Sequence, residues 1–423
     1  MENADHIPLA SSRAQTRDLP NDRDTSSCSG DGGCSSAMRT RNGRVARFGE
    51  VTLPASKSES NRALMIAAYG GFAPVFQNLS DSHDTKVLSA ALCSAQKGEH
   101  TIDIADCGTA ARFMTTYLAC REGDWILTGT DRMKQRPMAS LVDALRRLGA
   151  NIQYVENEGC LPLRIKGNQI KGGKVSIDMT QSSQFASSLL LAAPMWPQGL
   201  EMELVGELSS VPYLEMTLAM LRHFGAEIVQ SARMIKVFPK SYQSNSFTIS
   251  ADWSAASYWY EMAALSEECE IRLRGLSRNS LQGDTVIVDW MRKLGVGTFI
   301  ENDAIVLRKI PFEKHSFTFD FSQHPDLYPT MAATCAGLNV EATFAGLDNL
   351  ALKESDRVEA MQSELAKLGN QPLRFCAHND HRIVMALAPL SMLFGPLGFD
   401  HPEVVVKSYP NFWKDAAFLP VCG

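Results

Sequence analysis

The sequence predicts an α/β fold made of repeated subdomains, and an internal repeat is the main reason. Four short phrases, LRRLGA, LRHFGA, MRKLGV and LAKLGN, each end a helical pattern with a glycine, as helix C-termini often do. These glycines are Gly149, Gly225, Gly295 and Gly369. Their spacings of 76, 70 and 74 residues are too long for a solenoid unit, so repeated α/β subdomains fit better.

Paired strand-like segments follow three of the four phrases. Apolar and polar residues alternate over residues 151–154 and 163–165, then 227–229 and 235–238, then 298–300 and 304–307. Alternation of this kind is typical of half-buried strands, so we expect a hairpin after each phrase. Between Gly369 and His381 only 11 residues remain, so we expect the hairpin of the fourth copy to be missing.

Composition and charge exclude several classes of protein. The chain has 423 residues, enough for two or three domains, and its 45% hydrophobic and 21% charged residues are ordinary for a globular protein. A formal net charge of −6 provides no basic surface for nucleic acid, and no apolar run approaches the length of a membrane span. The 10 cysteines form neither a CxxC pair nor a Cys/His cluster. We therefore expect reduced thiols, a cytoplasmic location and no metal site.

Residues 1–44 differ from the rest of the chain. They are rich in Ser, Arg, Asp, Gly and Asn and poor in large apolar residues, which predicts a disordered tail. The segment lacks the apolar core of a signal peptide, and its acidic residues argue against a transit peptide. The folded part is therefore expected to begin at about residue 45.

The segment LPASKSESNRA, residues 53–63, gathers polar side chains before and within a helix expected over residues 62–69. The first turn of a helix leaves N–H groups unpaired and carries partial positive charge. With Lys57, Arg62 and the hydroxyl of Ser58 beside it, such a helix start suits a phosphate or carboxylate. Taken alone, the segment is equally consistent with an ordinary capped helix.

Further helix starts of this kind follow in the first half of the chain. They contain Asp106, Gly108, Thr109 and Arg112 in DCGTAAR, Arg136 in KQRP, Ser182, Ser183 and Gln184 in SSQ, and Ser210. Each has a simple capping explanation by itself. Together, in an acidic chain, they predict helix N-termini that converge on an anionic ligand.

The second half of the chain adds motifs that contain both acidic and basic residues. The candidates are Asp326 in HPDLYP, Asn349 upstream of Lys353, Glu354 and Arg357 in KESDR, His381 and Arg382 in NDHR, and Lys407 in VVVKSYP. Lys353 and Arg357 stand four residues apart, where like charges repel on a helix surface. An anion between these two cations is the simpler account of the pair. NDHR alone is also consistent with a capped helix and an incidental histidine.

Taken together, SKSxSNRA, GTAxR, RMKxRP, SSQ, KExDR and NDHR resemble the motifs of the 5-enolpyruvylshikimate-3-phosphate (EPSP) synthase family, in the same order and similar spacing. The resemblance runs from about residue 51 to residue 413. It implies transfer of the enolpyruvyl group of phosphoenolpyruvate to the 5-hydroxyl of shikimate 3-phosphate, with release of phosphate, in the shikimate pathway. Both substrates are multiply anionic, which accounts for the cations in these motifs. The resemblance implies no metal and no organic cofactor.

The resemblance also implies a fold. That family has two globular domains, each built from three βαβαββ units in an inside-out α/β barrel, with the active site in the cleft between them. Residues 45–53 plus 252–423 would form the first domain, and residues 54–251 the second. We expect a monomer whose partners are its two small-molecule substrates, with no nucleic acid and no membrane among them.

Residue roles follow only from the matched motifs. Shikimate 3-phosphate would be held by Ser58, Arg62, Ser182, Ser183, Gln184, Ser210, Asn349 and Lys353. Phosphoenolpyruvate would be held by Lys57, Gly108, Arg136, Arg357, Arg382 and Lys407. Asp326 would accept the hydroxyl proton, Glu354 would shuttle the proton at C3, and Lys57 would sit between the reacting centres. Arg112, His381, Asp106 and Thr109 are placed at the site without a defined role.

Departures from the family pattern leave two alternatives open. Asp106 stands where many relatives have Asn, so we expect it to form a salt bridge with Arg112 or Lys57. Residues 90–102 and 369–378 are shorter than expected, which is compatible with a phosphate-binding relative that has lost activity. The other alternative is the sister transferase that acts on UDP-N-acetylglucosamine. It uses a loop cysteine as its acid, and no matching loop follows Arg112.

Overall fold

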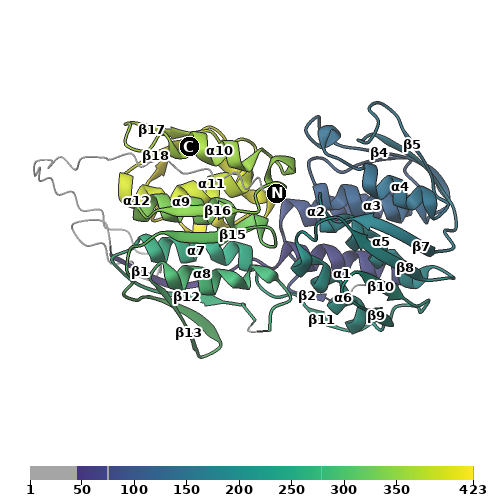
Figure 1. Cartoon of the computed structure of the whole chain (residues 1–423), viewed down its shortest axis with the longest axis horizontal. Coiled ribbons are helices and arrows are strands. Elements are labelled where there is room, and N and C mark those ends of the chain that lie inside the picture. The colour runs from purple at the N-terminus through teal and green to yellow at the C-terminus, as the bar shows by residue number, and fades with distance from the viewer. Residues whose placement is uncertain (1–44, 74–75, 278, 423) are drawn as a thin grey trace, which may run out of the picture.

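Two lobes lie side by side in the computed structural model (Figure 1), which describes residues 45–73, 76–277 and 279–422. Their buried apolar side chains form two clusters. One cluster lies within residues 55–249 and defines what we call the middle lobe. The other lies within residues 51–53 and 251–419 and defines the terminal lobe. The expected tail, residues 1–44, lies outside the described residues.

The middle lobe combines helices with two four-stranded sheets. Its elements are α1 (Lys57–Gly70), β2 (Phe76–Gln77), α2 (His83–Lys97), β3 (Thr101–Asp103), α3 (Gly108–Ala119), β4 (Gly123–Thr128), η1 (Met133–Gln135), α4 (Ala139–Arg147), β5 (Asn151–Tyr154), β6 (Leu163–Gly167), β7 (Gly173–Asp178), α5 (Ser183–Ala192), η2 (Ala193–Met195), β8 (Leu200–Val205), α6 (Val211–His223), β9 (Ile228–Gln230), β10 (Met234–Val237) and β11 (Phe247–Thr248). The sheets have the orders β3-β4-β6-β5 and β7-β8-β10-β9. In both, the first two strands are parallel and the last two form an antiparallel hairpin.

The terminal lobe is assembled from both ends of the described chain. Its elements are β1 (Val45–Thr52), α7 (Trp253–Leu265), β12 (Glu268–Arg274), η3 (Gly283–Val286), α8 (Ile287–Lys293), β13 (Val296–Glu301), β14 (Ala304–Lys309), β15 (Phe317–Asp320), η4 (Pro325–Leu327), α9 (Tyr328–Leu338), β16 (Ala342–Ala345), η5 (Leu350–Leu352), α10 (Arg357–Leu365), β17 (Leu373–Phe375), α11 (His381–Leu387), η6 (Ala388–Leu390), α12 (Ser391–Phe394), β18 (Leu397–Phe399), η7 (Pro402–Lys407), α13 (Phe412–Asp415) and β19 (Val421–Cys422). Its sheet β1-β12-β14-β13 has the same pattern of one parallel pair and one hairpin. The parallel pair β15-β16 and the parallel sheet β17-β18-β19 complete the lobe.

The repeated glycines lie where the sequence predicts. Each has a positive φ, from +87° at Gly295 to +96° at Gly149, which costs glycine little and other residues more. The three predicted hairpins are confirmed as β5-β6, β9-β10 and β13-β14. After Gly369 comes β17, which pairs in parallel with β18, so the missing hairpin is also confirmed within the described residues.

The predicted start of the first helix was wrong by five residues. α1 begins at Lys57 rather than at residue 62, and the side chain of Ser56 accepts a hydrogen bond from the Glu59 N–H at 3.3 Å. The first turns are polar but buried, with Glu59 only 1% exposed. An argument from apolar side chains therefore missed them. Lys57 and Ser58 consequently lie inside the first turn of the helix.

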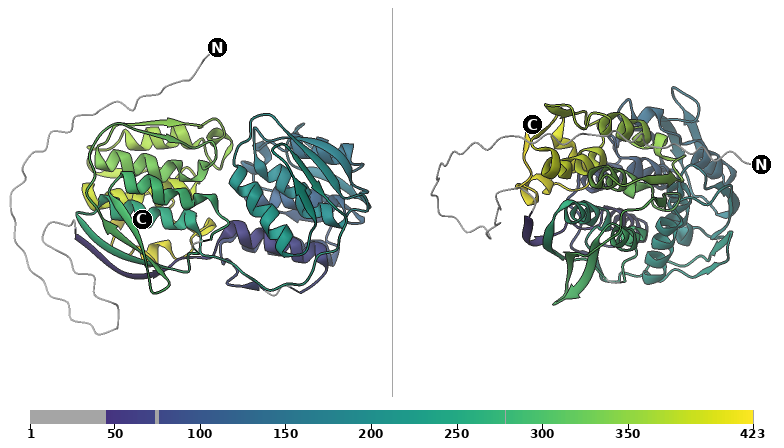
Figure 2. Two further views of the ribbon diagram at one scale, coloured as in Figure 1. Left: turned by 60° about the horizontal axis from the view of Figure 1, so that its bottom comes forward. Right: turned by 60° about the vertical axis from the view of Figure 1, so that its left-hand side comes forward.

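The chain passes between the lobes twice, and the two passages are hydrogen-bonded to each other. Ala55 and Ala251 form an antiparallel bridge, and Ser56 N–H donates to the Ser250 carbonyl at 2.8 Å. The Asp252 N–H donates to Pro54 at 2.9 Å. Figure 2 shows α1, in purple, beginning at this junction. The start of α1 is therefore fixed relative to both lobes.

α7 forms the centre of the terminal lobe, and each of its residues is buried. One of them is Glu261, whose two carboxylate oxygens have no hydrogen-bond partner among the described residues. Burial raises the pKa of Glu261 well above its ordinary value, so it is protonated at neutral pH.

For comparison with membrane proteins, no helix within the described ranges has the length and apolar character needed to cross a bilayer.

Glu261→Gln should stabilise the lobe in a pH-dependent way. In the unfolded chain Glu261 loses its proton above about pH 4.3, whereas the folded protein retains it, so the free energy of unfolding falls as pH rises. The neutral amide removes this loss. We expect a clear gain in the free energy of unfolding at pH 8 and little gain at pH 4.5. Urea unfolding at both pH values measures it, with exposed Glu227→Gln as control. An equal effect at both pH values would contradict a buried neutral carboxyl.

Candidate active site

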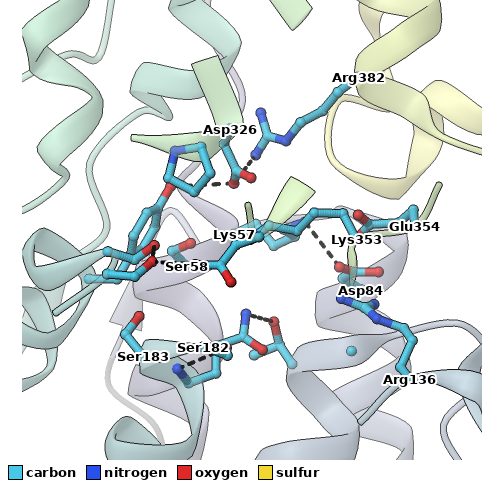
Figure 3. A pocket seen from close by; sticks show the side chains of 18 of the residues that line it. Lys57, Ser58, Asp84, Arg136, Ser182, Ser183, Asp326, Lys353, Glu354 and Arg382 are labelled. Carbon is cyan, nitrogen blue, oxygen red and sulfur yellow. Dashed lines mark hydrogen bonds and ion pairs between the residues drawn. The ribbon is translucent and has the colours of Figure 1, made fainter. Parts of the chain in front are cut away.

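A cavity between the lobes collects most of the predicted site residues (Figure 3). Its lining from the middle lobe is Lys57, Ser58, Arg62, Asp84, Gly108, Thr109, Arg136, Gln181, Ser182, Ser183, Gln184, Ser209, Ser210 and Tyr213. Its lining from the terminal lobe is Pro325, Asp326, Asn349, Lys353, Glu354, Arg357, His381 and Arg382. The three predicted residues outside this lining border it. Arg112 lines a small adjoining pocket with Arg136, while Asp106 and Lys407 line a neighbouring cleft.

Helices of both lobes begin at this cavity. Its lining includes the first or capping residue of α1, α3, α5 and α6 in the middle lobe and of α10 and α11 in the terminal lobe. The predicted convergence of helix starts is therefore present in the structure. Because helix N-termini carry unpaired N–H groups and partial positive charge, the arrangement favours anions.

Asp326 is held between two arginines. Its Oδ1 accepts from Arg357 at 2.9 Å and its Oδ2 from Arg382 at 2.7 Å. Burial alone would raise the pKa of Asp326, but the charges of Arg382, Lys353 and Arg357 outweigh it and hold that pKa well below its ordinary value. Asp326 is therefore a carboxylate of fixed orientation at the cavity wall.

Arg357 is surrounded by carboxylates. Besides Asp326 it donates to Glu354 at 2.8 Å and to Asp380 at 2.8 Å, and its side chain is 1% exposed. Sequence reasoning assigned a ligand anion to the space between Lys353 and Arg357. That assignment was incomplete, because the carboxylates of the chain itself already compensate Arg357.

Lys57 pairs with a carboxylate that the sequence analysis did not single out. Its Nζ lies 3.0 Å from the Asp84 carboxylate, and its main-chain N–H donates to the Asp252 carboxylate at 3.2 Å. Burial would lower the pKa of Lys57, but Asp84 more than offsets this and raises it. Lys57 is therefore positively charged. Ser82 caps α2 within the segment SDSHD. This is a polar helix start like those from which the other candidate residues were chosen, so it could have identified Asp84.

Asp106 forms a salt bridge, but not with either expected partner. Its carboxylate and its main-chain carbonyl both accept from Lys407 Nζ, the carbonyl at 3.0 Å. Arg112 lies six residues further along and Lys57 is held by Asp84, whereas Lys407 ends η7 and reaches Asp106 from the other lobe. The expectation of a pair with Arg112 or Lys57 was therefore wrong.

Arg112 and Arg136 lie together at the start of α3. A Cβ atom placed on Gly108 would stand 2.3 Å from Arg112 Nη1 and 2.5 Å from Arg136 Nη1. A larger residue at position 108 would force the guanidinium groups out of these positions. Burial and the charge of Arg136 lower the pKa of Arg112 well below its ordinary value. Arg112 Nε and Nη1 and Arg136 Nε are buried and have no hydrogen-bond partner among the described residues, so no carboxylate of these residues occupies them.

Hydroxyl and amide groups dominate another part of the lining, and some of them share a small pocket with Arg112 and Arg136. Ser182 accepts from the Gln184 N–H at 3.2 Å, and the Gln184 side chain donates to Thr109 at 3.3 Å. Asn349 reaches across from the terminal lobe and donates to Ser209 at 2.9 Å. Ser183 and Ser210 belong to the same group, at the starts of α5 and α6. These neutral groups suit a ligand with several hydroxyls.

Arg62 is more enclosed than the sequence suggests. It is 2% exposed and donates to Thr217 at 2.7 Å, to the Ser58 carbonyl at 2.9 Å and to the Tyr213 carbonyl at 3.1 Å. Burial lowers the pKa of Arg62 to about 10. Its guanidinium therefore fixes α1 against α6 as well as lining the cavity.

The neutral side chains of Tyr213 and His381 complete the lining near Asp326. The Tyr213 hydroxyl lies within hydrogen-bond distance of Asp284 at 3.2 Å and of Asp326 at 3.4 Å. Burial and the charge of Asp326 raise the pKa of Asp284 to about 6. His381 is 1% exposed, and burial together with Lys57 and Arg382 lowers its pKa well below the ordinary value, so it is neutral at pH 7.

Arg132 joins the two lobes beside the cavity. From the middle lobe its guanidinium donates to the carbonyls of Glu354 and Lys353, each at 3.1 Å, and of Ala351 at 3.5 Å. It therefore holds the main chain of the loop that carries Lys353 and Glu354. Arg132 opens the motif RMKQRP, but the sequence could not show that this side chain crosses between lobes.

Comparison with known families identifies relatives over most of the chain. The family model described as EPSP synthase (3-phosphoshikimate 1-carboxyvinyltransferase) matches residues 89–416. A 3-phosphoshikimate 1-carboxyvinyltransferase of Bacteroides fragilis strain YCH46 is 43% identical over 386 residues, covering 86% of this chain and 93% of the relative. One from Haemophilus influenzae strain PittEE is 35% identical over 423 residues, covering 88% and 96%.

Solved structures resemble this fold as well. The EPSP synthase of Acinetobacter baumannii aligns with a TM-score of 0.68 at 20% identity, covering 88% of this chain and 96% of that one. The enolpyruvyl transferase NikO of Streptomyces tendae aligns with a TM-score of 0.61 at 16% identity, covering 89% and 95%. At these identities the alignments show the mixed α/β fold alone.

Arg132→Ala should loosen the loop over residues 351–356. Because hydrogen bonds from a charged donor each contribute about 1.5–3 kcal/mol, their loss should speed amide hydrogen exchange of this loop about tenfold or more. Hydrogen-exchange mass spectrometry measures it, peptide by peptide. Lys134→Ala, which removes only a pair with Glu156 in the same lobe, is the matched control. Unchanged exchange in Arg132→Ala would show that the contact does not order the loop.

Proposed function

Because this chain belongs to the EPSP synthase (3-phosphoshikimate 1-carboxyvinyltransferase) family, we propose that it transfers the enolpyruvyl group of phosphoenolpyruvate to the 5-hydroxyl of shikimate 3-phosphate. The reaction releases phosphate on the route to chorismate and the aromatic amino acids. The observation that carries the proposal is that Asp326, Glu354 and a group of fixed cations meet in one cavity between the lobes. Addition and elimination at an enol phosphate require these groups.

The two substrates occupy different parts of the cavity in this proposal. The hydroxyl- and amide-rich part holds shikimate 3-phosphate through Ser58, Arg62, Ser182, Ser183, Gln184, Ser210, Asn349 and Lys353. The cation-rich part holds phosphoenolpyruvate through Lys57, Gly108, Arg136, Arg357, Arg382 and Lys407. Arg136 lines the cavity together with Lys57 and Gly108, which supports this placement of a phosphate. Thr109 and His381 line the boundary without a chemical role.

In the addition step the 5-hydroxyl oxygen bonds to C2 of phosphoenolpyruvate, and its proton passes to Asp326. Asp326 is a weak base while it accepts hydrogen bonds from both Arg357 and Arg382. A substrate carboxylate bound by the same arginines shares their charge and adds a negative one. Both effects raise the pKa of Asp326, so binding of phosphoenolpyruvate strengthens the base.

In the same step Glu354 delivers a proton to C3, which gives a tetrahedral ketal phosphate. Burial would raise the pKa of Glu354, but Arg357 and Arg136 hold it well below its ordinary value, so Glu354 takes up this proton only once phosphoenolpyruvate shares their charge. Elimination returns the C3 proton to Glu354, breaks the bond from C2 to the phosphate oxygen and releases phosphate, which takes the proton held by Asp326. Lys57, kept charged by Asp84, stabilises the negative charge that develops on the leaving phosphate. Enclosure between the lobes excludes water, which would otherwise compete with the 5-hydroxyl.

The same proposal covers the domain organisation. Residues 45–53 plus 252–423 form one domain and residues 54–251 the other, each built from three βαβαββ units. Within the described residues, three of these units have the complete four-stranded sheet, two in the middle lobe and one in the terminal lobe. The two apolar clusters and the three sheets of common strand order support this division. The enzyme acts in the cytoplasm. It acts as a monomer, since both parts of the cavity come from one chain.

The alternative of a UDP-N-acetylglucosamine transferase finds less support in the cysteines. Cys107 is fully buried, and burial raises its pKa above the ordinary value. Burial likewise raises the pKa of Cys120 to about 12. Neither thiol is placed to act as a general acid in the cavity, and neither lines it.

Phosphate release with each acceptor tests the proposed function. Purified protein with phosphoenolpyruvate should release phosphate when shikimate 3-phosphate is present, and none with UDP-N-acetylglucosamine. Release with UDP-N-acetylglucosamine alone would establish the sister activity. No release with either acceptor would identify a phosphate-binding relative that has lost activity.

Glu354→Gln should separate chemistry from binding. The amide cannot carry the proton at C3, so turnover should fall by about 10²–10⁴, as for other general acids and bases. The affinity for shikimate 3-phosphate, measured by calorimetry, should change little. Glu359→Gln, an exposed residue in the first turn of α10, is the control for the loss of a carboxylate nearby. Turnover equal to wild type would remove Glu354 from the mechanism.

A further inference from the structure

The Lys407 ammonium group is already bound by the protein. It donates to the main-chain carbonyl of Asp106 at 3.0 Å and to the carboxylate of the same residue, and it lies 3.6 Å from Asp84 Oδ1. A lysine has three N–H donors, and its side chain here is 5% exposed. These contacts leave little donor capacity for a further anion.

The arginines of the same region differ from Lys407 in this respect. Arg112 and Arg136 keep nitrogen atoms without hydrogen-bond partners among the described residues. An incoming phosphate group therefore displaces no carboxylate from these nitrogen atoms. It can bind Lys407 only by taking the place of Asp106.

Asp106 is placed so that it can be displaced. Its side chain is 41% exposed, and it lines a cleft of 720 Å³ at the edge of the cavity. That cleft also borders Arg136, Glu354 and Lys407. The carboxylate can therefore turn toward solvent when a ligand anion takes its position, at no cost of burying an unpaired charge.

We propose that Asp106 is a specificity-determining residue, an internal anion that competes with the phosphate group of phosphoenolpyruvate for Lys407. The inference rests on the proposed function and deepens it. Asp106 lowers the affinity for phosphoenolpyruvate and for other anions that use Lys407. It leaves the affinity for shikimate 3-phosphate unchanged, because that ligand is held by the hydroxyl- and amide-rich part of the cavity.

Asp106→Asn tests the proposal, since it keeps the main-chain carbonyl and the side-chain size but removes the charge. We expect the KM for phosphoenolpyruvate, and the dissociation constant of inorganic phosphate measured by calorimetry, to fall about tenfold, as for loss of one competing charge. The KM for shikimate 3-phosphate should change less than about twofold. Asp131→Asn, an exposed carboxylate lining the same cleft, is the matched control and should change neither constant.

A second background separates competition from general charge repulsion. With Lys407→Met in place, Asp106→Asn should no longer tighten phosphate binding, because nothing remains to compete for. Equal tightening in both backgrounds would overturn the proposal, as would unchanged or weaker phosphate binding in the single variant. Phosphate binding is measured without turnover, so this result stands apart from the phosphate-release assay of the proposed function.

Discussion

The site depends on one buried cation and the acids that compensate it. Arg357 is 1% exposed and lies against Asp326, Glu354 and Asp380, each within 2.9 Å. Removing one partner from a buried ion pair costs about 3–5 kcal/mol, because the other charge stays buried. Asp380 caps α11, so the same contacts fix a helix start and the orientation of two cavity carboxylates. The proposed chemistry thus uses groups that the fold cannot move independently.

A second charge network faces it from the middle lobe. Lys57, Asp84, Lys407 and Asp106 alternate in sign along a line of contacts, and Lys407 is contributed by the terminal lobe. Each cation keeps its charge because a carboxylate offsets its burial. This helps to explain how an acidic chain concentrates cations at one place, because Lys57, Arg357, Arg382 and Lys407 are each paired with a carboxylate. Arg112 and Arg136 differ, since their like charges are held side by side at Gly108.

Local signals account for what the sequence could predict. Glycine at helix ends and alternation in the strands identified three hairpins and the missing fourth. Motifs at helix starts identified most of the cavity lining. Contacts between distant segments escaped prediction: Asp84 beside Lys57, Lys407 as the partner of Asp106, and Arg132 across the lobes. Which of several cations a carboxylate meets is decided by packing, and no single segment contains that information.

The two passages between the lobes explain why the first motif is central. Asp252 caps α7 in the terminal lobe through Ser254 N–H at 2.8 Å and accepts from Lys57 N–H at the start of α1. Glu59 in α1 accepts from Ser250 N–H at 2.9 Å. A rotation of one lobe against the other about these strands displaces residues close to them least. Lys57 is thus tied to both lobes through Asp252, which suits its proposed place between the reacting centres. The polar and buried first turn of α1, which defeated the prediction of its start, is the part that makes these contacts.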